Sequence, residues 1–396
     1  MTMGNKKNVP AIRFKGFTKD WKKQQLGDCA DIIGGGTPAT SNQEYWDGDI
    51  NWYSPAEIGD KIFIDKSKRK ITSLGLKESS AKILPIGTVL FSSRAGIGNT
   101  AILVKEGATN QGFQSIIPHK GKLDTYFIFS RTRELKKYGE TNGAGSTFIE
   151  VSGKQMENMP IINPEIDEQE AIGNFFQNID RLINTSQAKL DKLKNIQKAC
   201  LEKMFPRNGS NTPELRFKGF TDEWDIVKIK ELCSITTGKS NTQDQVEDGA
   251  YPFFIRSDKA VRSNRYLYDC EAVLTIGDGN IGKVFHYVNG KFDLHQRVYK
   301  MDNFINILGK YFYYYFSTMF YERAMSMTAK ATVDSIRLEM ISEMNIMMPI
   351  SLDEQSKIAG FFSELDDLIA KTEQQINKLK NIKRACLDKM FVNRED

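Results

Sequence analysis

The sequence predicts an α+β protein in which two β-rich mixed α/β domains alternate with two long helices that carry a coiled-coil seam. Three observations predict this fold class. A nine-residue segment occurs twice, a 39-residue segment without proline occurs twice, and short β-branched or aromatic runs punctuated by Gly, Asn, Asp and Ser lie between them. A chain of 396 residues is also long enough for two or three domains. We therefore expect an internal repeat in the order domain, helix, domain, helix.

The shorter repeat opens each half of the chain. RFKGFTKDW at 13–21 and RFKGFTDEW at 216–224 agree at seven of nine positions, with a constant offset of 203. We expect this segment to attach each domain to the helices, because its aromatic side chains can anchor a domain on a helix bundle. These aromatic residues are Phe14, Phe17 and Trp21 in the first copy and Phe217, Phe220 and Trp224 in the second.

The longer repeat predicts the two helices. Residues 167–205 and 353–391 align without gaps and are identical at 20 of 39 positions. In the later part of each copy, apolar residues follow alternating steps of four and three, which is the spacing of a coiled-coil seam. Pro164 and Pro349 stand just upstream, where proline is tolerated at a helix start. Each helix would be about 55 Å long. Its expected partner is the matching stripe of the other copy; two separate surface helices are the alternative.

The regions between the repeats have the pattern of strands followed by a helix. Strand candidates are TVLFSS (88–93), TAILV (100–104), YPFFI (251–255) and KVFHYV (283–288). Helices are expected around 125–139 and 310–325. The tyrosines of the second helix, Tyr311, Tyr313, Tyr314 and Tyr315, point all round it and are expected to lie mainly in the core. These elements divide the chain into a domain at 1–160, a helical region at 161–207, a second domain at 208–347 and a helical region at 348–396.

Composition narrows the class of protein. The formal net charge of +5 permits a polyanionic partner without proving one. The five cysteines form no CxxC pair and there are three histidines, so no metal site is expected. The N-terminal residues lack the apolar core of a signal peptide, and no stretch is apolar enough to span a membrane. We therefore expect a cytoplasmic protein with reduced thiols and no membrane segment.

Two glycine-rich motifs resemble nucleotide-binding sequences. GDGNIG (277–282) has the spacing of a dinucleotide loop, but the residues after it predict a strand where such a loop needs a helix. SITTGKS (234–240) imitates the end of a phosphate-binding loop, but Cys233 stands where the first glycine is needed. We expect instead tight loops whose glycines permit positive φ and a close approach to a ligand. No nucleophile elbow or HExxH motif is present, so no catalytic residues are expected.

Each variable region contains a basic stretch and a polar turn at a similar place. KIFIDKSKRK (61–70) and RSDKAVRSNR (256–265) are rich in Lys and Arg, which supply sequence-independent attraction to phosphate. TNQGFQ (109–114) follows AGIGNTAILV (95–104), and DLHQRV (293–298) follows GDGNIG (277–282); their amide and imidazole groups are candidates for contact with bases or phosphate. An ordinary solvated surface is the alternative for the basic stretches, and buried hydrogen bonds are the alternative for the turns.

With these features the chain closely resembles the specificity subunit of type I restriction–modification enzymes. The resemblance rests on the doubled RFxGFT-W segment and the repeated helix pattern EQ…I..FF…D..I…K-L-K…MF, and it covers nearly the whole sequence. It implies two target recognition domains, each of which reads one half of a split, asymmetric site in double-stranded DNA. It also implies two antiparallel spacer helices that dock two methyltransferase subunits. An antiparallel pair would place Cys200 and Cys386 at opposite ends, so no disulfide is expected between them.

The resemblance also implies a division of labour. The partner methyltransferase subunits would use S-adenosylmethionine to methylate adenine, and separate restriction/translocase subunits would use ATP and Mg²⁺. This chain would be a non-catalytic specificity subunit that binds none of these cofactors. Two alternatives remain: a two-headed DNA-binding regulator without enzyme partners, and a protein-binding adaptor that never meets DNA.

By their positions in the predicted loops, twenty residues are candidates for DNA contact. In the first domain they are Gly36, Thr37, Lys66, Lys68, Arg69, Ser93, Arg94, Asn99, Asn110, Gln111 and Thr147. In the second domain they are Lys239, Ser240, Arg256, Lys259, Asp278, Asn280, His295, Gln296 and Lys330.

Overall fold

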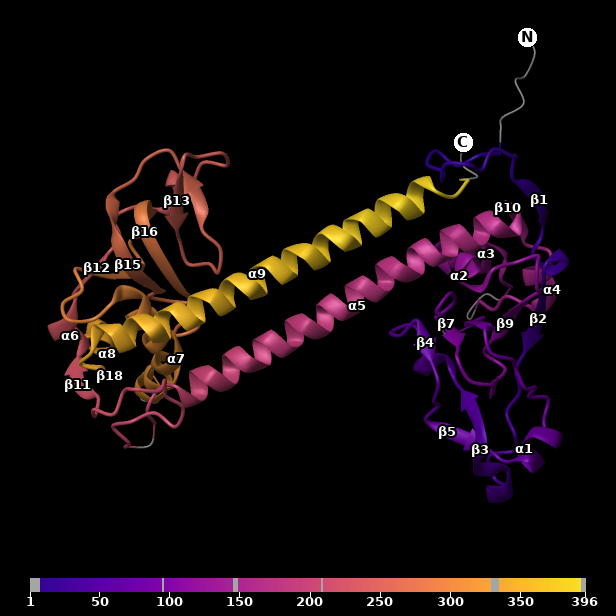
Figure 1. Ribbon diagram of the computed structural model, residues 1–396, viewed down its shortest axis with the longest axis horizontal. Helices are drawn as coiled ribbons and strands as arrows, with labels where there is room; N and C mark the ends of the chain where they lie inside the picture. Colours follow the sequence, from indigo (N-terminus) through magenta and orange to yellow (C-terminus); the bar gives the residue numbers. More distant parts are fainter. Residues whose placement is uncertain (1–7, 95, 145–148, 208, 329–334, 393–396) are drawn as a thin grey trace, which may run out of the picture. The chain divides into compact units, whose positions relative to one another are not determined.

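The chain, known from a computed structural model, forms two compact units (Figure 1). The structure describes residues 8–94, 96–144, 149–207, 209–328 and 335–392. The first unit comprises residues 1–186 and 375–396, and the second comprises residues 187–374. Each unit therefore combines one β-rich region with parts of both long helices.

The first unit is built mainly from short strands. These are β1 (Lys22–Gln25), β2 (Ala30–Gly34), β3 (Trp46–Tyr53), β4 (Phe63–Ile64), β5 (Arg69–Ile71), β6 (Val89–Phe91), β7 (Thr100–Leu103), β8 (Gly107–Thr109), β9 (Gln114–Pro118) and β10 (Pro160–Asn163). Its short helices are α1 (Ser73–Lys77), α2 (Thr125–Ser130), α3 (Thr132–Asn142) and α4 (Gly153–Glu157). Single 3₁₀ turns lie at Leu26–Asp28, Gln43–Tyr45 and Pro55–Glu57.

The second unit has fewer and longer strands. These are β11 (Asp225–Lys228), β12 (Ser234–Thr237), β13 (Tyr251–Phe254), β14 (Val261–Ser263), β15 (Tyr268–Ile276), β16 (Phe285–Leu294), β17 (Val298–Asp302) and β18 (Asn345–Met348). Its helices are α6 (Ile229–Leu232), α7 (Gly309–Thr328) and α8 (Leu338–Ser342), with a 3₁₀ turn at Thr242–Asp244. The strand candidates in both regions are confirmed.

Both units share one sheet topology although their sequences differ. The main sheet of the first unit has the order β2-β9-β6-β7-β4, and that of the second has the order β12-β17-β15-β16-β13-β14. In both, the fifth strand pairs in parallel with the fourth, while the other pairs among these five are antiparallel. A two-stranded antiparallel ribbon, β1-β10 or β11-β18, also recurs in each unit. The first unit adds a three-stranded sheet, β5-β3-β8.

The two long helices confirm the longer repeat. Helix α5 runs from Ile166 to Lys203 and α9 from Leu352 to Lys389, each over 38 residues. They are antiparallel within each unit. In the first unit Phe176 stacks on Phe391, just after α9, and Asp180 contacts Lys383. In the second unit Lys194 contacts Glu373, and Gln197 contacts Asp366. As the α5 residue number rises, the number of its α9 partner falls. Figure 1 shows α5 in magenta and α9 in yellow.

The start of each long helix receives an arginine from the shorter repeat. Arg13 donates to both carboxylate oxygens of Glu168, at 2.6 and 2.7 Å, and Arg216 does the same to Glu354, at 2.7 and 2.8 Å. Both carboxylates are buried, with 2% of each side chain exposed. The repeated segment thus attaches each β-rich region to a helix, as expected.

Aromatic packing completes this attachment. Phe14, Trp21, Phe217 and Trp224 lie in or against the two largest hydrophobic cores. Phe14 meets Phe175 of α5 edge to face with a ring separation of 5.7 Å, and Phe220 lies below the ammonium of Lys357 of α9 at 4.8 Å. The anchoring role predicted for these five aromatic residues is confirmed, and that of Phe17 stays a prediction.

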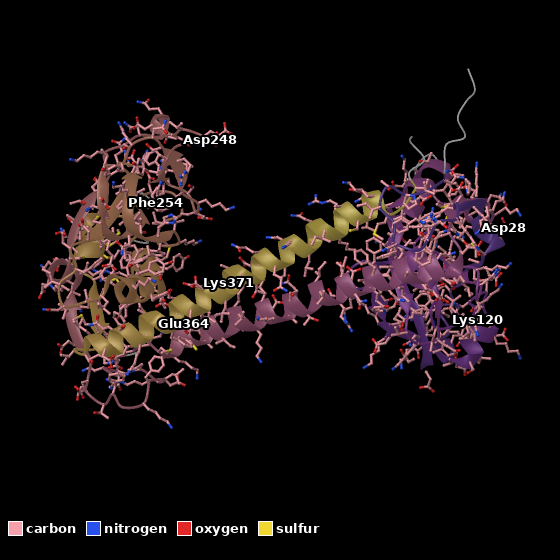
Figure 2. All side chains as sticks on the ribbon, turned by 45° about the horizontal axis from the view of Figure 1, so that its top comes forward. Asp28, Lys120, Asp248, Phe254, Glu364 and Lys371 are labelled. Carbon is pink, nitrogen blue, oxygen red and sulfur yellow. The ribbon has the colours of Figure 1, made fainter. Side chains whose placement is uncertain are left out.

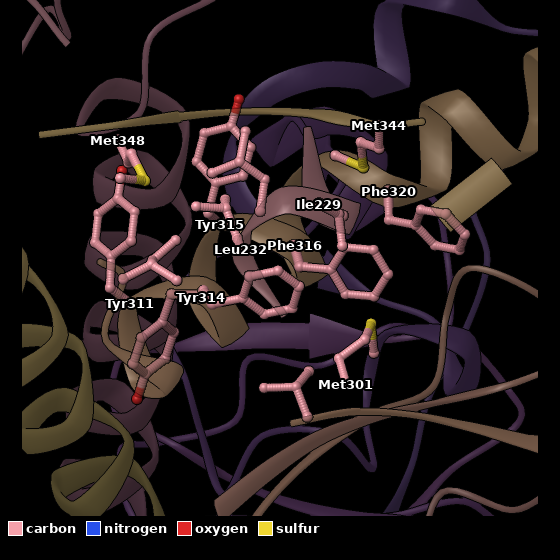
Figure 3. Close-up of a cluster of buried hydrophobic side chains, with 14 of the residues drawn as sticks. Ile229, Leu232, Met301, Tyr311, Tyr314, Tyr315, Phe316, Phe320, Met344 and Met348 are labelled. Carbon is pink, nitrogen blue, oxygen red and sulfur yellow. The ribbon is translucent and has the colours of Figure 1, made fainter. Parts of the chain in front are cut away.

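The core of the second unit gathers around α7. Figure 3 shows Tyr311, Tyr314, Tyr315, Phe316 and Phe320 of this helix together with neighbouring apolar side chains. Three of the four predicted tyrosines are buried and Tyr313 is half-buried, so their expected place in the core is confirmed. Because these aromatic residues are consecutive, they point to all sides of α7. They can be buried because other parts of the unit enclose the helix on several sides.

The helix expected around 125–139 is interrupted. Helices α2 and α3 meet at Arg131, whose backbone leaves the helical region at φ −93° and ψ 16°. The buried guanidinium donates to Asn163 Oδ1 at 2.5 Å and to Glu134 Oε2 at 2.7 Å. The break lets a charged side chain find these partners inside the unit, since a buried charge is costly without them.

Two further properties concern the cysteines and the helices of the described residues. All five cysteines lie in the described part of the chain and are free thiols; Cys200 packs against the core of the second unit and Cys386 against that of the first. Across the described ranges, none of the helices combines the length and apolar character needed to cross a membrane.

A surface carboxylate of the second unit predicts a pH dependence. Glu343 accepts hydrogen bonds from Lys228 and Lys230, both at 2.7 Å, which lowers its pKa to about 2. When folding lowers the pKa of a carboxyl group, the ionised carboxylate stabilises the folded protein at pH values above its ordinary pKa of 4.5. This stabilisation is lost as the pH falls towards 2. We expect Glu343→Gln to lower the Tm at pH 6, with the difference from wild type shrinking below pH 4.5. Glu231→Gln, an exposed carboxylate change nearby, is the control; a pH-independent difference would contradict the prediction.

Candidate functional site

A polar turn is the centre of the candidate site in the first unit. This turn, residues 110–112, is joined to neighbouring segments by backbone hydrogen bonds. The bonds run from Asn110 N to Tyr53 O (3.0 Å), from Gly36 N to Thr109 O (2.8 Å), from Ser93 N to Gly112 O (2.8 Å) and from Val151 N to Ser93 O (3.1 Å). The segments that contain Gly36, Tyr53, Ser93 and Val151 therefore come together around this turn.

The second unit repeats this arrangement around residues 295–297. The bonds run from His295 N to Phe254 O (3.0 Å), from Lys239 N to Leu294 O (3.1 Å), from Gly277 N to Arg297 O (2.7 Å) and from Ile336 N to Gly277 O (2.7 Å). Figure 2 marks Phe254, the end of β13, in this unit. Asn110, Gln111 and Gly112 thus correspond to His295, Gln296 and Arg297. We call residues 110–112 and 295–297 the paired turns.

A glycine lies directly beneath each paired turn. A Cβ on Gly35 would come within 2.1 Å of Asn110 O, and a Cβ on Gly238 within 2.2 Å of Leu294 O. Side chains cannot fit at such distances, so the close approach of the two segments requires glycine. These two residues are also 203 positions apart, the same offset as the shorter repeat. The predicted Gly36 is the next residue, and it is buried against Ser80.

Three predicted residues of the first unit come together at its turn. The hydroxyl of Thr37 contacts the side-chain oxygen of Gln111, and Asn110 Oδ1 accepts the backbone N–H of Gly112 at 2.8 Å. Gln111 is exposed, while Thr37 and Asn110 are half-buried. Ser93, in contrast, is fully buried, and its hydroxyl has no partner among the described residues. Asn110, Gln111 and Thr37 therefore form the accessible part of this group.

Arg94 and Asn99 belong to the loop between β6 and β7. The Arg94 guanidinium lies 3.7 Å from Glu150, and Asn99 is exposed, with its backbone N–H donated to the hydroxyl of Ser92 at 2.9 Å. Gly96 and Gly98 of this loop have φ of 103° and 93°, in the left-handed region that favours glycine. Thr147 lies outside the described residues.

The predicted basic residues Lys66, Lys68 and Arg69 are exposed. The Arg69 guanidinium lies 3.5 Å from the centre of the Trp46 ring, in a cation–π contact. Trp52 joins this segment to Gly36, because its backbone N–H donates to Ser67 Oγ at 3.0 Å and its ring N–H donates to Gly36 O at 2.8 Å. The basic stretch and the paired turn are thus held on one framework.

In the second unit, Arg256, Asp278 and His295 lie together. The Arg256 guanidinium is 3.4 Å from Asp278, and about half of its side chain is exposed. Burial lowers the pKa of His295, and the charge of Arg256 lowers it further. The imidazole is therefore neutral at pH 7, and its Nδ1 accepts the backbone N–H of Arg297 at 3.0 Å. This leaves Nε2 as the protonated nitrogen.

The segment after β12 completes the second site. Lys239 and Gln296 are exposed, and the Gln296 amide donates to Asn241 Oδ1 at 2.6 Å. Ser240 is buried, and its hydroxyl donates to the buried carboxylate of Asp293 at 2.5 Å. Ser240 therefore acts inside the unit, while its neighbour Lys239 faces solvent.

Two other predicted residues lie in neighbouring loops. Lys259 and Asn280 are exposed, but their described hydrogen bonds use only their backbone carbonyls, which accept from Ser257 Oγ at 2.6 Å and Lys283 N at 3.2 Å. The structure does not bring either into contact with the paired turn within its described ranges. Lys330 lies outside those ranges.

Sequence reasoning missed Arg265 and Arg297. Arg297 completes the second paired turn and is exposed. Arg265 is about half exposed and contacts Ser240, Asp244 and Asp293. Both lie within stretches singled out for their composition, RSDKAVRSNR and DLHQRV, so their charge was a signal, but their contacts depend on the fold. In the described part of the chain, no cluster of His, Cys, Asp or Glu is placed to hold a metal ion.

Comparison with known proteins identifies relatives of both units. Residues 18–195 and 221–381 match the family described as "Type I restriction modification DNA specificity domain". The specificity subunit of type I restriction enzyme MjaIX from Methanocaldococcus jannaschii is 30% identical over 246 residues, which are 59% of this chain and 57% of that protein. The EcoR124I/EcoR124II specificity subunit from Escherichia coli is 30% identical over 182 residues, 44% of each protein. The chain thus spans about half the length of these two relatives.

One solved structure shares the fold along almost the whole chain. It is the crystal structure of the S subunit of a type I restriction–modification system from M. genitalium, with a TM-score of 0.71 and 14% sequence identity. The superposition covers 97% of this chain and 99% of that one. At this identity the likeness concerns the fold alone.

Proposed function

The chain belongs to the family of type I restriction–modification DNA specificity subunits, and we propose that each of its two β-rich units reads one half of a bipartite, asymmetric DNA site. The observation that carries this proposal is the hydrogen-bond arrangement shared by the paired turns. A shared backbone with different side chains suits two readers that do the same task on different sequences. Asn110 and Gln111 at one turn, and Gln296 and Arg297 at the other, would present different donors and acceptors to base edges.

Charge around the turns supports DNA as the partner. Lys66, Lys68 and Arg69 supply positive charge in the first unit, and Lys239 and Arg256 supply it in the second; all five are exposed. Exposed cations bind the phosphates of DNA whatever its base sequence, whereas amide and guanidinium groups distinguish base pairs in the major groove. Each unit would therefore combine affinity from its basic residues with selectivity from its turn.

The long helices offer repeated positions for docking two methyltransferase subunits. Leu182 and Ile196 of α5 and their equivalents Leu368 and Ile382 of α9, each 186 positions later, are 38–48% exposed. The first unit carries Leu182 and Ile382, and the second carries Ile196 and Leu368. Exposed apolar side chains at repeated positions suit two copies of one partner. The exposed Glu364 and Lys371 of α9, labelled in Figure 2, stand four residues before and three residues after Leu368.

In this assembly the chain contributes no catalytic group. S-adenosylmethionine would be bound by the docked methyltransferase subunits, which methylate adenine at the chosen site. ATP and Mg²⁺ would be used by restriction/translocase subunits that join through them. The specificity subunit itself determines where methylation or cleavage takes place.

The test is co-expression with the methyltransferase subunit of the same system, followed by single-molecule mapping of methylated adenines in the host DNA. We expect a stable complex with two methyltransferase copies and a methylated motif of two separated parts. A contiguous motif would overturn the two-reader proposal. DNA binding without a methyltransferase complex would favour the regulator, and failure to bind any duplex would favour the adaptor.

Arg256→Ala tests the phosphate contribution of the second unit. If Arg256 meets phosphate, its loss should weaken binding to all sequences and reduce the slope of log K against log salt by about one. The measurement is a duplex titration of the methyltransferase complex at several salt concentrations. Lys218→Ala, which removes an exposed charge from the shorter repeat, is the matched control. Unchanged affinity and slope in Arg256→Ala would remove this residue from the interface.

A further inference from the structure

A fully buried carboxylate lies beside the second paired turn. Asp293, at the end of β16, has no solvent exposure. It accepts hydrogen bonds from Ser240 Oγ at 2.5 Å and from the backbone N–H of Leu294 at 2.8 Å. It also accepts from Ser263 Oγ at 3.2 Å and from the Nε of Arg265 at 3.4 Å. A buried carboxylate needs this many donors, because its removal from water is otherwise strongly unfavourable.

Arg265 connects this buried carboxylate to the surface. Besides Asp293, its guanidinium contacts Ser240 Oγ at 3.1 Å and Asp244 at 2.8 Å. Even so, 52% of the Arg265 side chain is exposed. The planar guanidinium is therefore held in one orientation from within, with an outer edge in solvent. An arginine held in this way loses less side-chain freedom when it binds a ligand.

The same carboxylate also holds the loop that meets the turn. Ser240 lies in the segment after β12, and Asn241 in that segment accepts the amide of Gln296 at 2.6 Å. Asp244 further orders the segment by accepting the backbone N–H of Asn241 at 2.8 Å. Arg265, the loop and the paired turn are thus connected through one network.

The first unit shows that the backbone arrangement does not require this carboxylate. Asp293 lies two residues before His295, and the corresponding residue before Asn110 is Ala108. Ala108 is fully buried in an apolar cluster with Trp46 and Trp52. The same four backbone bonds form in both units, so Asp293 adds something beyond the fold itself. In the second unit, Asp293 is one of the groups that contact the Arg265 guanidinium.

The charges around Arg265 indicate its role. Asp244 and Asp293 offset its positive charge, which weakens its general attraction to phosphate. Its exposed N–H groups can still donate in a fixed direction, and a directed guanidinium is the usual partner of a guanine edge. Arg265 is therefore better suited to select a base pair than to add nonspecific affinity.

We propose that Asp293 is a positioning residue that presents Arg265 to a base edge of the DNA. Through Arg265 it sets the base preference at one position of the second half-site. This inference rests on the proposed function. The loop that carries Ser240 and Asp244 supports the same orientation. Asp293 itself does not touch DNA. The first unit has no equivalent of this ionic arrangement at Ala108, so the effect is confined to one half-site.

The experiment uses the complete methyltransferase complex on duplex libraries in which either half-site is randomised. We expect Asp293→Asn to relax the base preference at one position of the second half-site by about tenfold or more, the range of a lost bidentate arginine contact. Preference at the first half-site should stay as in wild type. Asp269→Asn, an exposed carboxylate change on β15, is the control with the same loss of charge.

Arg265→Lys provides a second test should Asp293→Asn fail to fold. It keeps the positive charge but loses the planar fork, so it should relax the same position with little change in salt dependence. If either folded variant keeps the wild-type base preference at both half-sites, the inference about Asp293 and Arg265 is overturned, while the proposed function stands. A wild-type complex without any bipartite preference would overturn the proposed function and this inference with it. A general loss of affinity without a change in preference would show that Asp293 is merely structural.

Discussion

Lys383→Met is expected to destabilise the first unit by about 2–3 kcal/mol. The Lys383 ammonium donates to both oxygens of Asp180, at 2.6 and 2.8 Å, and Tyr126 Oη donates to the same carboxylate at 2.9 Å. Only 8% of the Asp180 side chain is exposed, against 27% for Lys383. Methionine fills a similar volume but leaves a buried carboxylate without its cation. Urea unfolding of the intact chain, followed by fluorescence, measures the loss.

The second unit supplies the matched control for this change. There the equivalent carboxylate, Asp366, accepts from Tyr314 at 2.6 Å and from Gln197, the equivalent of Lys383. Glutamine is thus an accepted partner at this position of the repeat. We expect Lys383→Gln to cost less than about 1 kcal/mol, because it keeps a donor to Asp180. Equal stability of the methionine variant and the wild type would show that the ion pair contributes nothing measurable.

Arg216→Ala is expected to destabilise the second unit by about 3 kcal/mol. Its two hydrogen bonds to Glu354, at 2.7 and 2.8 Å, form a bidentate pair, and Glu354 is almost fully buried. Removing the guanidinium leaves that carboxylate without its main partner at the start of α9. Thermal and urea unfolding of the intact chain measure the effect. Arg216→Lys should be intermediate, because it keeps the charge and loses the bidentate geometry.

A double variant separates the pair from its surroundings. In Arg216→Met with Glu354→Leu, no charge is left unpaired, so part of the lost stability should return. Arg13→Ala, which leaves Glu168 in the same state in the first unit, should show a similar loss. A change below about 0.5 kcal/mol in Arg216→Ala would contradict the structural role assigned to the repeated arginine.

Much of the fold followed from the sequence because its signals are periodic. The bounds of the longer repeat, 167–205 and 353–391, lie within two residues of the ends of α5 and α9. The strand after GDGNIG, which argued against a dinucleotide loop, is present as β16. These features depend on neighbouring residues, so a local pattern is enough to predict them. The four-part division at residues 160, 207 and 347 stays a prediction.

The sequence predicted which turns form the candidate site, but not how their side chains are arranged. The positional match between TNQGFQ and DLHQRV correctly indicated equivalent turns, since Asn110 and His295 make the same backbone bond. The burial of Ser93 and Ser240 was not predictable, because a serine in a loop carries no sign of which side it faces. The contact of these twenty candidates with DNA stays a prediction.

The Glu-Gln pair at the start of each long helix shows that a repeated motif does not predict the hydrogen-bond partners of its residues. Gln169 donates to Pro164 O at 3.0 Å and accepts the N–H of Asp124 at 3.1 Å. Gln355 donates to Pro349 O at 2.8 Å and to Asn306 O at 3.2 Å. The repetition indicated that these residues matter, but two of their partners, Asp124 and Asn306, lie 45 and 49 residues away in sequence. Their role as ties between helix and domain emerged only from the fold.

The sequence by itself determined the repeat, the alternation of domains and helices, and the seam on each long helix. Those properties arise from local periodicity and from two copies of one pattern. The tertiary structure decided which side chains surround Asp293, which face of Arg265 reaches solvent, and which lysine meets Asp180. These depend on segments that are distant in sequence and meet only when the sheets close. A charge acts over a few ångströms, so its role is set by such neighbours and not by the residues beside it in the chain.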